Sequence, residues 1–180
     1  MIASSADVLA FWREAGEDRW YEKDTAFDDA IRRRFLETYE AAAAKQLMDW
    51  EANREGALAL VIVLDQFPRN MFRGSARAFA ADPIARRVAD RALARGFDLA
   101  TPVQERGFFY LPFEHSETMA DQERCCALFR ATDDAELLKW AEMHADIIRR
   151  FGRFPHRNAL LGRATTAEEQ AFLDEGGFAG

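Results

Sequence analysis

The sequence predicts an all-α fold in which antiparallel helices pack into a single-domain bundle or solenoid. Apolar residues recur at the three- and four-residue spacing of amphipathic helices along most of the chain. Capping residues, glycines and prolines separate these stretches at short intervals, and no segment has a convincing strand pattern. A chain of 180 residues can bury one core, so we expect one domain over residues 1–175 and a flexible tail over 176–180.

The first two predicted helices lie before residue 45. Residues 4–7 open a short helix that carries Val8, Leu9, Phe11 and Trp12 on its inner side. A longer helix is expected to start after Asp24, because apolar residues then follow with helical spacing at positions 27, 31, 35, 39 and 42.

Eight consecutive apolar residues at 57–64 form the centre of the predicted fold. The β-branched residues 61–63 favour a strand, and periodicity cannot decide for so short a run. The flanking residues favour a helix over 54–66, because Asn53 is a good N-cap and good helix formers follow. Pro68 is expected to stop this helix by forcing the preceding residue into an extended conformation.

Prolines mark the next predicted elements. A helical piece is expected over residues 75–81, and Asp82 followed by Pro83 predicts an N-capped helix that ends at Gly96. Residues 101–104 have the spacing of a capping box. The aromatic segment 106–117 is apolar on every side, and Pro112 should kink or divide it.

Three helices are predicted in the last third of the chain. The first covers residues 118–130, and the second is capped by Asp133 or Asp134 and ends at Gly152. After a short turn of helix to Leu161, residues 165–169 cap the last helix.

Composition excludes several classes of function. A net charge of −7 argues against general binding to nucleic acid or anionic membranes. No apolar run reaches the roughly 20 residues that cross a bilayer, and no secretory signal precedes the first helix. Cys125 and Cys126 lack metal-binding or redox spacing, which is typical of reduced thiols, so we expect a cytoplasmic protein.

Three polar segments adjoin buried apolar runs and contain the candidate site residues. The first is 65–74, the second is 113–117, and the third is 150–158, in which the Phe-Pro-Arg-Asn of the first recurs with one inserted histidine. One interpretation is a lattice of ion pairs that pins helix ends together. The other is a pocket in which part of this lattice faces a ligand. The candidate catalytic residues are Glu114, His115, Glu117 and His156, and the candidate ligand-binding residues are Arg69, Asn70, Arg73, Arg153, Arg157 and Asn158.

Histidine spacing disfavours a metal site. The chain has three histidines, His115, His144 and His156, and no HExxH or comparable motif. His144 falls on an apolar helical stripe, where a hydrogen-bonded core histidine is expected. We therefore expect no metal and no cofactor, and folding without metal.

Long motifs in these segments resemble one bacterial family. They are LDQFPRN at 64–70 with FRG at 72–74, YLPFEHSE at 110–117, and RFGRFPHRN at 150–158. LAFW at 9–12 and EEQAFL at 168–173 fit as well, so the chain resembles the domain of unknown function 924 family over almost its whole length. The resemblance implies an all-helical, tetratricopeptide-like fold and supplies no reaction.

Two functional hypotheses follow from the residues. The leading one is a helical protein that binds a small anionic molecule in a pocket lined by arginine, histidine and glutamate, with acid/base chemistry there if it is an enzyme. The alternative is a tetratricopeptide-like scaffold whose concave face binds a segment of a partner protein. A closed polar pocket favours the first hypothesis, and an open groove with exposed apolar residues favours the second.

Overall fold

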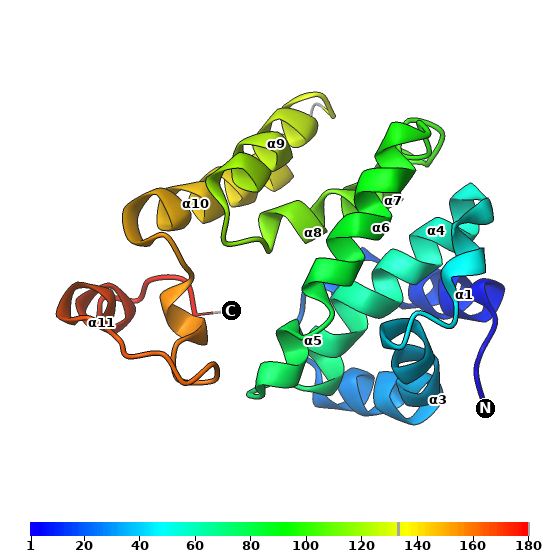
Figure 1. Ribbon diagram of the computed structural model, residues 1–180, viewed down its shortest axis with the longest axis horizontal. Coiled ribbons are helices and arrows are strands. Elements are labelled where there is room, and N and C mark those ends of the chain that lie inside the picture. The colour runs from blue at the N-terminus through cyan, green and yellow to red at the C-terminus, as the bar shows by residue number, and fades with distance from the viewer. Residues whose placement is uncertain (133, 180) are drawn as a thin grey trace. The chain divides into compact units, whose positions relative to one another are not determined.

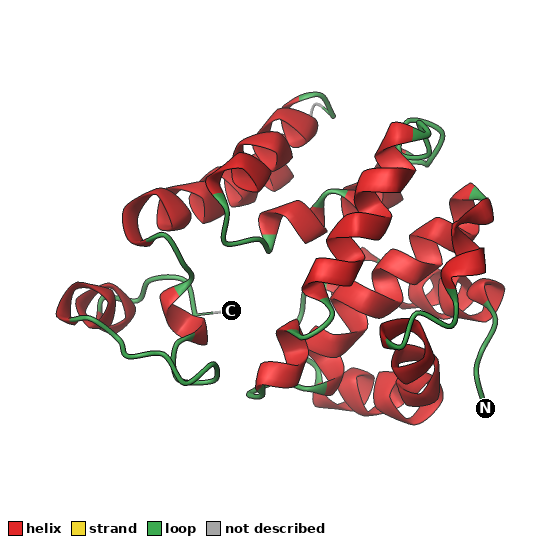
Figure 2. Ribbon diagram, in the orientation of Figure 1, coloured by secondary structure: helices red, strands yellow, loops and turns green. Residues whose placement is uncertain are grey.

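Helices connected by short turns make up the structure, a computed structural model that describes residues 1–132 and 134–179 (Figures 1 and 2). No described residue lies in a β-strand, which confirms the all-α prediction. The chain divides into a first unit, residues 1–73 and 77–112, and a second unit, residues 74–76 and the chain from Phe113 onward. The single-domain organisation and the tetratricopeptide-like detail stay predictions.

The first unit begins with α1 (Ser5–Ala15), α2 (Glu17–Trp20) and α3 (Thr25–Ala43), and side-chain caps set the starts of α1 and α3. Ser4 and Asp7 form a capping box in which each side chain accepts the backbone N–H of the other. The Asp24 carboxylate accepts the first free amides of α3, which confirms the predicted start of that helix.

The central helical run extends further than predicted. It begins after the predicted N-cap Asn53 with α4 (Arg54–Val61), continues through a π-helical turn, η2 (Ile62–Gln66), and ends with α5 (Phe67–Met71). The expectation that Pro68 stops the helix at Gln66 is therefore wrong. In the π turn the Phe67 amide bonds to the Ile62 carbonyl, five residues back, and such a widened turn relieves the clash that a proline causes in a regular helix.

Two predicted caps have other partners in the structure. Asp82 is the first residue of α6 (Asp82–Ala94) and its carboxylate binds Arg69, so it is not the N-cap that the sequence predicted. The Thr101 hydroxyl donates to the Phe97 carbonyl and caps nothing, so the predicted capping box is wrong as well.

Short helical pieces flank α6 along the chain. The helical piece predicted over 75–81 is the 3-10 turn η3 (Ala76–Phe79). Helix α7 (Val103–Arg106) leads into the aromatic segment, which contains η4 (Gly107–Phe109) and α8 (Leu111–Glu114). Two of these pieces, η3 and α8, contain residues of both units. The break before α8 confirms that Pro112 divides this segment.

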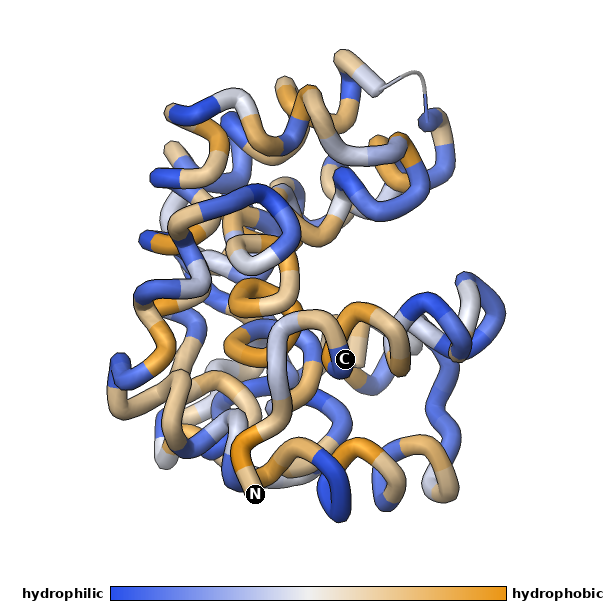
Figure 3. Tube along the Cα trace, turned by 90° about the vertical axis from the view of Figure 1, so that its right-hand side faces the viewer, coloured by the Kyte–Doolittle hydropathy of each residue, from blue (hydrophilic) through white to orange (hydrophobic). Residues whose placement is uncertain are grey.

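Aromatic side chains fill the core of the first unit. The rings of Phe35 and Phe67 lie 4.9 Å apart, and Trp12 packs edge-on against both Phe67 and Phe108. Each residue from Ala57 to Leu64 is buried, as the run of apolar residues predicts. Apolar and polar residues alternate along the helical turns of the chain, as Figure 3 shows by hydropathy.

The second unit contains α9 (Met119–Arg130), α10 (Ala135–Phe151), η5 (Pro155–Arg157) and α11 (Ala167–Asp174). Helices α9 and α10 lie side by side (Figure 1). Asp134 caps α10, as one of the two predicted alternatives, while Asp133 lies outside the described residues. Gly152 ends α10 in the left-handed conformation, with φ of 69°.

The C-terminal residues after α11 turn back onto the second unit. The Gly177 amide donates to the Phe172 carbonyl, and the Phe178 ring contacts the rings of His144 and His156. The flexibility of the tail from residue 176 stays a prediction.

Candidate functional site

The first polar segment belongs to the first unit, where carboxylates engage its polar side chains. Arg69 donates from Nη1 and Nη2 to the two oxygens of Asp82, both at 3.0 Å, and Nη1 also donates to the Asp65 carbonyl at 2.6 Å. Asn70 and Arg73 share one carboxylate, that of Asp28, with the Asn70 amide 2.7 Å from Oδ1. These contacts fit the ion-pair lattice interpretation.

The second and third polar segments meet within the second unit. Glu117, from the second segment, accepts the backbone amide of Phe154, in the third, at 2.8 Å. The same carboxylate receives both terminal nitrogens of Arg163. Burial acts to raise the pKa of Glu117, but the hydrogen bonds from Arg163 and Phe154 outweigh it and lower that pKa overall.

A second carboxylate, that of Glu169, accepts hydrogen bonds from more residues than Glu117 does. It is 2% exposed and accepts both Nε and Nη2 of Arg153, at 2.6 and 2.8 Å. The Asn158 amide and the Thr166 backbone amide also donate to it. The hydrogen bonds from Arg153 are the largest cause that lowers the pKa of Glu169, to about 2, so it is ionised at neutral pH.

Arg163 joins these two carboxylates into one network. Besides binding Glu117, it donates through Nε to Oδ1 of Asn158 at 3.0 Å, and Asn158 donates in turn to Glu169. The network fixes the turn around η5 from both sides. Of the predicted site residues, Glu117, Arg153 and Asn158 belong to it.

Two histidines of the second unit pack around two phenylalanines. The rings of His144 and His156 lie 5.6 and 5.7 Å from Phe154, and 4.5 and 5.1 Å from Phe178. His144 is 5% exposed with Nδ1 2.9 Å from the Trp140 carbonyl, which confirms the prediction of a hydrogen-bonded core histidine. Its Nδ1 also lies 3.6 Å from Oε1 of the buried Glu114.

Arg157 adds a positive charge beside these histidines. Its side chain is buried, with the residue 6% exposed, and its guanidinium lies 4.5 Å from the centroid of Phe154. Nη1 donates to the His115 carbonyl at 3.0 Å. These contacts link Glu114, His115, His144, His156 and Arg157, and we name them the histidine–arginine cluster.

Sequence reasoning missed three residues of these arrangements. Arg163 lies outside the quoted motifs, and Glu169 lies in EEQAFL and in the predicted cap at 165–169, where the sequence indicated only the start of a helix. His144 was assigned to the core alone, although its contact with Glu114 gives it a partner of chemical interest.

Within residues 1–132 and 134–179 no three histidine, cysteine, aspartate or glutamate side chains are grouped as metal ligands. In the same residues, no helix has both the length and the apolar character of a membrane span.

Comparisons with known proteins place the chain in a family. The family described as bacterial protein of unknown function (DUF924) matches residues 8–177. A solved structure of a protein of unknown function from Agrobacterium tumefaciens is similar, with a TM-score of 0.93 and 49% sequence identity over 95% of this chain and 97% of that one. No curated protein matches the chain. The extent of the family match shows that the chain belongs to the bacterial DUF924 family.

Proposed function

We propose that the second unit binds a small anionic molecule at the histidine–arginine cluster. The observation that carries this proposal is the burial of the Arg157 guanidinium on an aromatic ring, next to His115 and His156. A guanidinium in such a position is weakly hydrated and presents several N–H donors in one plane, which suits carboxylate and phosphate groups.

In this proposal the neighbouring residues have different roles. Glu117, Arg153 and Asn158 hold the η5 turn through their network and so position His156 and Arg157. Glu114 and His144, 3.6 Å apart and both buried, are a carboxylate–imidazole pair that can hold a proton beside the ligand. Arg69, Asn70 and Arg73 stay predicted ligand-binding residues, but their contacts with Asp28 and Asp82 favour a structural role in the first unit.

The test is isothermal titration of the protein with phosphate, sulfate, succinate and citrate. We expect at least one anion to bind, and Arg157→Met to weaken that binding by about tenfold or more, the loss of one charged hydrogen-bonding partner. Arg157→Lys should recover part of the affinity. Arg130→Met is the matched control, because Arg130 is exposed and pairs with Glu142 at the surface.

Two outcomes contradict the proposal. One is the absence of binding by all four anions, and the other is equal affinity in the wild type and a folded Arg157→Met variant. Far-ultraviolet circular dichroism and a thermal melt of each variant separate a lost site from a lost fold.

A further inference from the structure

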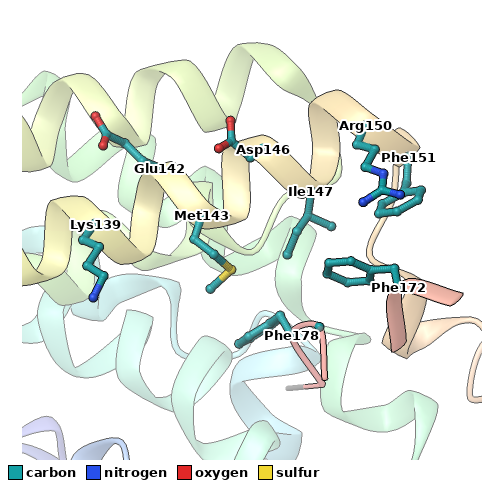
Figure 4. A pocket seen from close by; sticks show the side chains of 10 residues that line it. Lys139, Glu142, Met143, Asp146, Ile147, Arg150, Phe151, Phe172 and Phe178 are labelled. Carbon is teal, nitrogen blue, oxygen red and sulfur yellow. The ribbon is translucent and has the colours of Figure 1, made fainter. Parts of the chain in front are cut away.

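A cavity of about 500 Å³ lies on the second unit beside α10 (Figure 4). This volume falls within the range of small-molecule sites. Its apolar wall comes from α10, α11 and the C-terminal segment, and consists of Met143, Ile147, Phe151, Phe172 and Phe178. None of its lining residues belongs to the histidine–arginine cluster, but Phe178 also contacts the rings of His144 and His156, so the cavity adjoins that cluster and presents different side chains to a ligand.

The apolar wall is only partly covered by protein. Met143, Phe151, Phe172 and Phe178 are partly buried, and all pack against the buried core formed by Ile147, Ile148 and Phe154. In Figure 4 the Phe172 and Phe178 rings lie below Ile147, and Met143 reaches toward them. Such a concave surface of rings and a thioether offers a ligand hydrophobic and sulfur–aromatic contacts.

The charges at this cavity are not balanced. Glu142 and Asp146 line it, but Arg130 and Arg149 engage their carboxylates, and these four residues line a separate depression between α9 and α10. Figure 4 shows both carboxylates directed away from Phe172 and Phe178.

Two cations remain on the cavity side. Lys139 makes no ion pair within the described part of the chain, and its side chain extends along the edge of the cavity. Arg150 bonds to Glu168 at 2.9 Å and lies over the rings of Phe151 and Phe172. Of these two cations, Lys139 is the one without an ion-pair partner among the described residues, and it lies at the edge of the cavity to one side of the Phe172 and Phe178 rings (Figure 4).

We propose that this cavity binds a small organic carboxylate with an aromatic or other apolar body. The body occupies the space between Met143, Phe172 and Phe178, and the carboxylate faces the ammonium of Lys139. A neutral ligand of the same shape makes the apolar contacts but not the ionic one, so charge should separate the two.

The probe is 4-phenylbutyrate, with 4-phenylbutan-1-ol as the neutral match, titrated into the full chain carrying ¹³C-methyl methionine. The five methionines give the location of binding directly. We expect the Met143 resonance to shift and saturate with 4-phenylbutyrate, while Met48 and Met71, in the first unit, do not move. The alcohol should bind more weakly.

Lys139→Gln tests the ionic contact, and Lys23→Gln, an exposed lysine of the first unit, is its control. Lys139→Gln should weaken the affinity for 4-phenylbutyrate about two- to fivefold, the range for an ion pair at a protein surface, and leave the affinity for the alcohol unchanged. Lys23→Gln should change neither affinity.

The proposal is overturned if the Met143 resonance does not shift with 4-phenylbutyrate, if the acid and the alcohol bind with equal affinity, or if Lys139→Gln leaves the affinity for the acid unchanged. It is overturned as well if the Met143 resonance shifts with protein concentration rather than with ligand, because the apolar wall would then bind a second copy of the chain. Failure of phosphate or citrate to bind at Arg157 leaves these expectations unaffected.

Discussion

Arg163 holds both carboxylate oxygens of Glu117, with Nη1 2.7 Å from Oε2 and Nη2 3.0 Å from Oε1, across 46 residues of sequence. The same guanidinium donates to Asn158 and to the Phe154 carbonyl. One side chain thus connects the segment that follows α8 to the turn that follows α10.

Replacing Arg163 with Met should destabilise the protein by about 1–3 kcal/mol, because Glu117 and Asn158 lose a charged partner at partly buried positions. Urea unfolding at pH 7 measures this loss. Arg149→Met is the control, since Arg149 is 60% exposed and pairs with Asp146 at the surface, where about 0.5 kcal/mol or less is expected. Equal losses in the two variants would show that Arg163 is no more than a surface residue.

The network around Glu169 should give stability a defined dependence on acid pH. The pKa of Glu169 is about 2 in the folded protein and near 4.5 in the unfolded chain. Between these values the unfolded chain binds more protons, so this contribution is complete above the unfolded pKa and is lost as the pH falls from 4.5 toward 2.

Glu169→Gln should therefore flatten the fall in unfolding free energy between pH 5 and pH 3, and lower stability at pH 7. Glu168→Gln is the matched control, because its carboxylate is 65% exposed and pairs with Arg150 at the surface. Urea unfolding curves at several pH values measure the slope. A wild-type slope in Glu169→Gln would contradict the assignment.

Gly56 should not tolerate a side chain. A Cβ atom at this position would lie 2.1 Å from the backbone carbonyl oxygen of Trp50 in η1 (Met48–Ala52), and backbone cannot move aside as a side-chain end can. Gly56→Ala should therefore cost about 3 kcal/mol or more, at the upper end of overpacking effects, although alanine favours helix elsewhere.

Gly74→Ala is the comparison for this variant. Gly74 has φ of +73° and open space around its Cβ position, so alanine there meets only the backbone penalty of about 1–2 kcal/mol. Thermal unfolding of both variants gives the order of their stabilities. A Gly56→Ala variant more stable than Gly74→Ala would mean that η1 does not pack on α4 as described.

Helix starts could be predicted from the sequence because their causes are local. Asp24 and Asn53 each bond to amides two or three residues ahead, and Ser4 exchanges bonds with Asp7. A residue and its capping partner lie within one helical turn, so the interaction can be predicted from residues that are close in sequence.

The errors arose where a distant partner or an unusual turn decides the outcome. Asp82 has the sequence context of a cap, but Arg69, 13 residues earlier, takes its carboxylate. Pro68 has the context of a helix stop, but the π turn just before it opens the helix enough to continue. Neither effect can be inferred from the spacing of apolar residues.

The candidate site shows the same limit. Residue type identified Glu117, Arg153 and Asn158 as charged or polar groups beside buried segments, because such groups need partners. Which partner each takes depends on folding, since Glu117 binds Arg163 and Arg153 binds Glu169, 16 residues ahead. The partner of each charged residue therefore depends on how the helices pack and cannot be read from the sequence.

The last prediction concerns the two arginines of the first polar segment, which differ in burial. Arg69 is 19% exposed and holds Asp82 with both terminal nitrogens, while the fully buried Asp65 carboxylate lies 3.4 Å away. Arg73 is 36% exposed, and its partner Asp28 keeps the Asn70 amide when the arginine is removed. Arg69→Met should cost about 3–5 kcal/mol, and Arg73→Met about 1 kcal/mol.

Chemical denaturation of both Met variants and of Arg69→Lys, without added ligand, tests this order. Lysine restores the charge but not the two parallel hydrogen bonds, so Arg69→Lys should recover only part of the loss. A neutral or stabilising Arg69→Met would reverse the assignment. It would mean that Arg69 is held under strain of the kind found at binding sites, and that the first polar segment, rather than the histidine–arginine cluster, should be tested first for an anion.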